Sequence, residues 1–175
     1  MDLFGFIEYR CVVGSLAYGL ALKANPNVLE CLYSPMVEYA GPVALELLAI
    51  RHAFLSRRVY VTYREYVMAQ FRKLDGDRRS HRGIRWKHAM HLIRLLLAGI
   101  AVLRDGFLTV DAGEHRERLL AIRRGDLPWE DVDAWRLDLH RQLDAVAAQT
   151  PLPAEPDLER ADAFLIRARR AALNR

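Results

Sequence analysis

The sequence has few cysteines, few lysines and no apolar run long enough to cross a membrane. The two cysteines, Cys11 and Cys31, lie in segments that we predict to be apolar strands, so we expect small buried thiols and a cytoplasmic protein. The longest apolar run, Leu95–Leu103, is bracketed by Arg94 and Arg104. It is far shorter than the roughly 20 residues of a membrane span. We therefore expect a buried helix there and no membrane partner.

Positive charge is plentiful, and arginine carries most of it. Of the 26 basic residues only Lys23, Lys73 and Lys87 are lysines, and the 175-residue chain has a formal net charge of +4. Guanidinium groups bind phosphates in a fork geometry. The charge is compatible with nucleotide or nucleic-acid partners, but it does not by itself select one.

The N-terminal part reads as a short α/β segment. Phe6–Val13 is rich in aromatic and β-branched residues and ends at Gly14, so it is predicted to be a strand. Val28–Tyr33 alternates well enough to be a second strand, closed by Ser34 and Pro35. Two strands are too few for an independent sheet. We therefore expect residues 1–41 to form an incomplete module.

From Pro42 onward the apolar residues recur at helical spacing, and glycine and proline punctuate the pattern. The helix that we predict to begin at Arg57 is expected to end at Leu74, before the turn Asp75-Gly76-Asp77. Helices are expected over Val43–Leu55, Arg57–Leu74, Ile84–Arg104, Glu114–Arg124, Trp129–Ala148 and Pro156–Leu173. The predicted fold class is thus α+β and predominantly helical, with a truncated α/β module (1–41) followed by an all-helical bundle (42–175).

The motif that carries chemistry is the segment Val12–Gly19, a strand, a Gly14-Ser15 turn and a helix start. Glycine lets a phosphate approach the backbone, the serine adds a hydroxyl, and amides at a helix start point towards an anion. An ordinary strand-to-helix turn would have the same spacing.

This Gly-Ser-x-Ala-Tyr-Gly pattern resembles the signature of predicted nucleotidyltransferases of the DNA polymerase β superfamily. Four further segments resemble one bacterial branch of it: Ala21–Pro35, Ala53–Leu74, Arg85–Gly99 and Glu114–Arg136. The resemblance implies that Gly14 and Ser15 hold the phosphates of a nucleoside triphosphate. It also implies an Asp-x-Asp pair and a third carboxylate that bind two Mg²⁺ ions, and transfer of a nucleoside monophosphate to an acceptor with loss of pyrophosphate.

The sequence departs from that pattern after Gly19. Leu20 is followed directly by Ala21, and no acid occurs between Glu8 and Glu30, so the segment with the Asp-x-Asp pair is absent. We expect a gap or distortion at the Leu20–Ala21 junction, no metal site, and no transfer by the chain as it stands.

The third predicted helix supplies further candidate nucleotide-binding residues. Lys87, His91 and Arg94 share one face at i, i+4, i+7 spacing, and we predict that this face meets the cavity of Gly14 and Ser15. The alternative is a solvated basic face whose histidines bond to neighbouring helices. A third interpretation is the Arg-x5-His spacing of helical ribonucleases, present in Arg82/His88 and Arg85/His91.

Aromatic residues support two further expectations. Tyr60, Tyr63 and Tyr66 recur at helical spacing beside arginines, an arrangement that serves packing or the stacking of bases. Trp86, Trp129 and Trp135 are expected to be core anchors.

Taken together, the sequence predicts a nucleotidyltransferase-family protein that uses a nucleoside triphosphate and Mg²⁺ and acts on an RNA or protein acceptor. The alternative is a non-catalytic nucleotide- or RNA-binding protein, or an antitoxin-like partner of a toxin–antitoxin pair.

Overall fold

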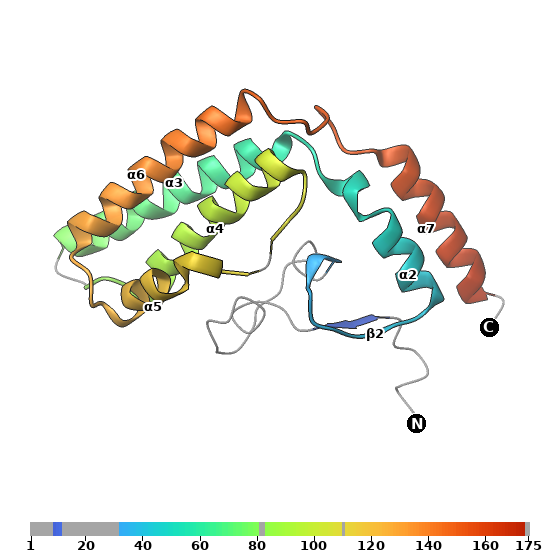
Figure 1. Cartoon of the computed structure of the whole chain (residues 1–175), viewed down its shortest axis with the longest axis horizontal. Coiled ribbons are helices and arrows are strands. Elements are labelled where there is room, and N and C mark those ends of the chain that lie inside the picture. Colours follow the sequence, from blue (N-terminus) through green and yellow to red (C-terminus); the bar gives the residue numbers. More distant parts are fainter. Residues whose placement is uncertain (1–8, 12–31, 81–82, 110, 174–175) are drawn as a thin grey trace.

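The computed structural model describes residues 9–11, 32–80, 83–109 and 111–173. Within these ranges the protein is predominantly helical, as the sequence predicted (Figure 1). Its elements are β1 (Tyr9–Cys11), β2 (Val37–Ala40), α2 (Pro42–Ala49), the 3₁₀ turn η2 (Arg51–Phe54), α3 (Arg58–Arg79), α4 (Trp86–Asp105), the 3₁₀ turn η3 (Gly113–His115), α5 (Arg116–Arg124), α6 (Trp129–Ala147) and α7 (Leu158–Leu173).

The two short strands form an antiparallel ribbon. Tyr9 lies opposite Ala40, and Cys11 lies opposite Val37. β1 falls inside the predicted strand Phe6–Val13, but its partner strand was not predicted. The ribbon does not confirm a truncated α/β module, and the division at residue 41 stays a prediction.

The second predicted strand, Val28–Tyr33, is wrong at its C-terminal end. Leu32 and Tyr33 have helical conformation and are buried. The ring of Tyr33 packs edge-on against Phe107 at 4.8 Å, and the guanidinium of Arg51 donates to the carbonyl of Leu32 at 3.2 Å. These contacts with distant segments override the local alternation, which is a weak determinant of strand structure.

Helix α4 forms the centre of the bundle, and α3, α5 and α6 pack around it. Within the run Leu95–Leu103, Leu96 and Leu103 are fully buried and only Leu97 and Ala101 are partly exposed, so the predicted buried helix is confirmed. By length and composition alone α4 could also cross a membrane, but most of it is enclosed by its neighbours. It is the core helix of the bundle.

Gly99 sets how closely the helices around α4 approach it. A Cβ atom at this position would lie 2.7 Å from Cδ2 of Tyr63 on α3 and 3.3 Å from Cδ1 of Leu143 on α6. Carbon atoms in contact normally lie about 3.5–4.0 Å apart. The missing side chain therefore lets α3 and α6 pack against the same point of α4.

Two predicted helix boundaries are wrong. The predicted turn at Asp75-Gly76-Asp77 does not form, and α3 continues to Arg79. A single glycine costs a helix only about 1 kcal/mol, and Leu74, two residues before Gly76, is fully buried. The helix expected over Val43–Leu55 instead ends at Ala49, because Ile50 leaves helical geometry and η2 follows.

The three tryptophans are anchors, as predicted. Trp129 and Trp135 are buried, and Trp86 packs against the same core. Gly125 ends α5 with a φ of 78°, and a Cβ there would meet the indole of Trp86 at 2.8 Å. Glycine is thus required both for the left-handed turn and for the approach of the ring.

Helix α7 lies beside α2, apart from the group formed by α3 to α6 (Figure 1). The segment that leads to it is fixed at its start, because the buried hydroxyl of Thr150 donates to the carbonyl of Leu103 at 2.6 Å. Arg167 of α7 pairs with Glu46 of α2. None of the side chains of α7 is buried.

Substitution at two helical glycines tests the role of Gly99. Gly99→Ala should lower the free energy of unfolding by roughly 1–3 kcal/mol, because Tyr63 and Leu143 must move away. Gly76→Ala is the matched control: nothing lies within 4 Å of its added Cβ, so the better helix propensity of alanine should raise stability by about 0.5–1 kcal/mol. Urea unfolding measures both. A stabilising Gly99→Ala would contradict the packing described here.

Candidate functional site

The sequence-predicted site residues divide into two groups. Gly14 and Ser15 lie outside the described residues, as does the Leu20–Ala21 junction. Lys87, His91 and Arg94 all lie on α4, in the order of increasing burial: Lys87 is exposed, His91 is half-buried and Arg94 is only 7% exposed. The geometry of the last two can be followed atom by atom.

Arg94 and His91 form a polar pair on the inner part of this face. Nη2 of Arg94 lies 3.0 Å from Nδ1 of His91. Because arginine only donates, Nδ1 must accept, and the proton of the neutral ring is assigned to Nε2. Burial, together with the nearby charges of Arg94, His88 and Lys87, lowers the pKa of His91 to about 4. At neutral pH the ring is therefore an uncharged acceptor that orients Arg94.

His88 faces a different neighbour. Its Nε2 lies 3.2 Å from Oε1 of Gln70 on α3. Burial lowers its pKa, and the nearby charges of Arg85 and Lys73 add to that effect. This contact agrees with the interpretation in which the histidines of α4 bond to neighbouring helices.

The ribonuclease-like Arg-x5-His spacing does not correspond to a shared contact in the described part of the chain. Arg85 pairs with Asp77 of α3 at 3.6 Å, whereas His91 pairs with Arg94. Arg82 lies outside the described residues.

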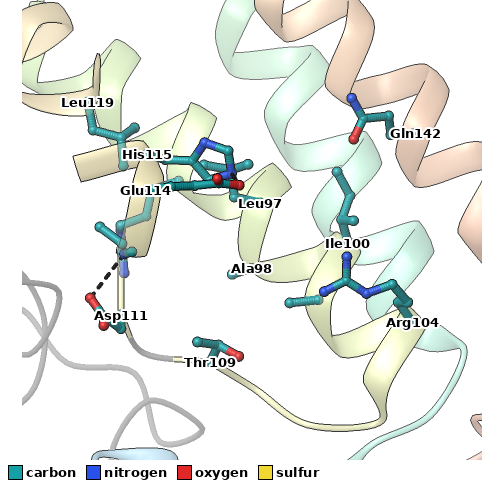
Figure 2. Close-up of a pocket in the computed structure, with 14 residues that line it drawn as sticks. Leu97, Ala98, Ile100, Arg104, Thr109, Asp111, Glu114, His115, Leu119 and Gln142 are labelled. Carbon is teal, nitrogen blue, oxygen red and sulfur yellow. Dashed lines mark hydrogen bonds and ion pairs between the residues drawn. The ribbon is translucent and has the colours of Figure 1, made fainter. Parts of the chain in front are cut away.

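Arg94 lines a cavity of about 380 Å³. This volume lies within the range of small-molecule sites, roughly 300–1,000 Å³. Figure 2 shows Ile100 and Arg104 on α4, Thr109 and Asp111 on the segment that follows, and Gln142 reaching in from α6. The remaining polar lining residues are Glu114 and His115 of η3. Lys87 is not among the residues that line it.

The two walls of the cavity carry opposite charge. Arg94 and Arg104 belong to α4, which forms one wall, while Asp111 and Glu114 belong to the segment between α4 and α5, which forms the other. Oδ1 of Asp111 accepts from the amide of Gly113 at 3.1 Å, which fixes the loop. Arg104 is partly offset by Asp105, which it contacts at 2.8 Å. Such a cavity suits a ligand that carries an anionic group at one end and hydrogen-bond donors at the other.

The described carboxylates do not fit a two-metal site. No group of three or more metal-ligating side chains occurs among the residues that the structure describes. Asp-x-Asp pairs do occur at 75/77 and 131/133, but both lie on helices, where residues two apart point to different sides. Asp75 and Asp133 are also held by arginines, Arg79 at 2.6 Å and Arg136 at 2.7 Å respectively.

Sequence reasoning found Arg94 but missed the opposite wall. Thr109, Asp111 and Glu114 belong to a connection that has no periodicity, and Gln142 is one polar residue on a long helix. The only signal was the helix stop at Asp105 and Gly106, followed by a short polar stretch before α5.

With this geometry described, comparison with known proteins identifies the family. The model of the RNA repair pathway DNA polymerase beta family, RlaP, matches residues 17–167, and the chain belongs to that family. The resemblance to polymerase β superfamily nucleotidyltransferases is thereby confirmed. Absence of the Asp-x-Asp segment stays a prediction from the sequence. No curated protein and no solved structure matches the chain.

The lowered pKa of His91 predicts that the folded protein loses stability in acid. Unfolded chains take up a proton on histidine near pH 6.5, whereas the native ring resists it down to about pH 4. Since the unfolded state binds more protons in this window, the free energy of unfolding should fall on acidification from pH 6.5 to 4, by up to roughly 3 kcal/mol from this residue.

Urea titrations at several pH values measure this dependence. His91→Gln keeps an acceptor for Arg94 but cannot titrate. The free energy of unfolding of this variant should therefore fall less steeply with decreasing pH than that of the wild type. Some dependence on pH should remain, because burial also lowers the pKa of His88 and His140. His52→Gln, which removes an exposed histidine, is the control. An equal dependence of the free energy of unfolding on pH in the wild type and in His91→Gln would refute the prediction.

Proposed function

We propose that this protein takes part in nucleotidyl transfer, in which a nucleoside monophosphate passes from a nucleoside triphosphate to a hydroxyl of an RNA acceptor. The family match over residues 17–167 carries the proposal. In this reaction the acceptor oxygen bonds to the α-phosphorus. The bond from that phosphorus to the oxygen bridging to the β-phosphate breaks, pyrophosphate leaves, and the hydroxyl proton passes to water.

The described residues fit the binding of the triphosphate. Arg94 is proposed to contact its phosphates from α4, together with Gly14 and Ser15, which lie outside the described residues and enter from the sequence pattern alone. A guanidinium fixed in advance by a neutral histidine needs little reorganisation when charge develops nearby, which is the source of electrostatic catalysis. Arg94 has this arrangement through its bond to His91.

Members of such families typically use Mg²⁺ to neutralise phosphate charge. The carboxylates described above do not converge on a metal site, and no step is assigned to them. The proposed contribution of the helical part is binding and orientation of anions.

A second candidate is binding of nucleotide or RNA without transfer. One sequence observation favours it: no acid occurs between Glu8 and Glu30, where the family pattern leads to metal-binding aspartates. Nucleotidyl transfer depends largely on metal and electrostatic stabilisation. A chain without those carboxylates would keep the binding function and lose the chemistry.

One assay separates the two candidates. The full chain is incubated with each α-phosphate-labelled nucleoside triphosphate, Mg²⁺ and single-stranded RNA, and ATP binding is measured by calorimetry with and without Mg²⁺. Labelled RNA with released pyrophosphate would support transfer, and it would overturn the expectation, drawn from the sequence after Gly19, that the chain as it stands does not transfer. Saturable ATP binding with no labelled product would favour the non-catalytic candidate, and absence of both would exclude both.

Arg94 provides the residue-level test. A charge-assisted contact is worth about 1.5–3 kcal/mol, so Arg94→Gln should weaken ATP binding by roughly 10- to 150-fold. Arg94→Lys keeps the charge and should recover part of the loss. Arg141→Gln removes an exposed arginine of α6 and is the control. Thermal melting of each variant shows whether it is folded, and unchanged ATP affinity in a folded Arg94→Gln would remove Arg94 from the site.

A further inference from the structure

The surface over the α3–α4 pair carries two lysines, Lys73 and Lys87, that no carboxylate of the described residues neutralises. No acidic residue occurs between Asp77 and Asp105. Among the described residues, no carboxylate lies within ion-pair distance of Lys73 or Lys87. Many of the described arginines, by contrast, form ion pairs with acidic residues, as Arg64 does with Asp144 at 3.1 Å. We call the surface formed by Tyr66, Gln70 and Lys73 of α3 with Arg85, Lys87 and His88 at the start of α4 the basic strip.

Contacts between the two helices hold the strip together. His88 bonds to Gln70 at 3.2 Å, and Arg85 reaches Asp77 at 3.6 Å, so the end of α3 lies against the start of α4. Lys73 is exposed, and its charge lowers the pKa of His88. Lys87 is also exposed, and its charge lowers the pKa of His91. Lys73 lies one turn from Gln70, and Lys87 directly precedes His88, so both lysines lie close to the contact between Gln70 and His88.

An aromatic ring extends the strip along α3. Tyr66, Gln70 and Lys73 follow one another at i, i+4, i+7, so they share one face of the helix. Tyr66 is 45% exposed, unlike the buried Phe71 and Val67 beside it. With a rise of 1.5 Å per residue, Tyr66 lies about 10 Å along α3 from Lys73.

The charge distribution at the start of α4 does not favour helix stability. Its first turn contains no acid, although the N-terminus of a helix is the positive end of its dipole and is stabilised by acids. Lys87 is placed in that turn. A bound anion would relieve the repulsion between this lysine and the helix end, so the start of α4 favours a negatively charged ligand.

We propose that the basic strip binds a single strand of RNA, with a base stacked on Tyr66 and backbone phosphates on Lys73 and Lys87. Single-strand sites combine cations that follow the backbone with aromatic rings that accept any base. The inference deepens the proposed function, on which it rests for RNA as the acceptor. It assigns the RNA to the α3–α4 surface and leaves the Arg94 cavity to the triphosphate.

Salt dependence tests the proposal. Binding of a short fluorescein-labelled single-stranded RNA to the full chain is followed by anisotropy over a series of NaCl concentrations. Each phosphate contact contributes about 0.7 to the slope of log K against log salt for single strands. Lys73→Gln and Lys87→Gln should each lower the slope by about that amount and weaken binding roughly three- to tenfold at low salt.

Tyr66→Leu should act differently from the lysine variants. Loss of stacking should weaken binding by roughly fivefold or more and leave the salt slope unchanged, because no charge is removed. Arg169→Gln removes one exposed charge from α7, far along the chain, and should change neither quantity by much. Melting temperatures close to that of the wild type confirm that the variants are folded.

Several results would overturn the proposal: no RNA binding by the wild type, lysine variants with unchanged affinity and slope, or an Arg169→Gln effect as large as theirs. The transfer assay is read separately. RNA binding that depends on Lys73 and Lys87 without any transfer would reject the catalytic proposal alone. Transfer that proceeds with unaltered RNA affinity in both lysine variants would reject the basic strip alone.

Discussion

The contact on which the rest of the structure depends is the packing of α3 and α6 against α4 at Gly99. Because this residue has no side chain, Tyr63 and Leu143 reach the backbone of α4 from two sides. Close packing of this kind leaves no room for adjustment. It fixes the rotation of α4 about its axis, and thereby decides which residues of a mostly apolar helix enter the core and which face the cavity.

The placement of charge follows from that rotation. Arg94 lies on a helix that is otherwise apolar through its middle, and only 7% of the residue is exposed to solvent. A buried guanidinium is costly unless polar groups surround it. His91, held uncharged by its surroundings, supplies one such group one turn away. The polar face of α4 is thus fixed by packing as firmly as its apolar face.

The reaction of the family needs metal-binding carboxylates, whereas the described residues of this chain mainly offer cations. A nucleotidyltransferase of the polymerase β type needs phosphate-binding groups and metal-binding carboxylates. The described residues supply cations at the wall of the Arg94 cavity and at the start of α4, while Asp75 of α3 and Asp133 of α6 are paired with arginines. No group of metal-binding carboxylates occurs among the described residues, and the absence of the Asp-x-Asp segment stays a prediction from the sequence.

The sequence by itself determined the helical class, the core position of Leu95–Leu103, the stop at Gly125 and the family, since each is written in local spacing or in residues that match a known pattern. Tertiary structure decided that α3 runs through Gly76 and that Leu32 and Tyr33 are helical, because burial outweighed local preference. It also decided the cavity, whose lining residues are brought together by packing alone. No spacing rule connects residues that meet only when α4, the following loop and α6 are folded against one another.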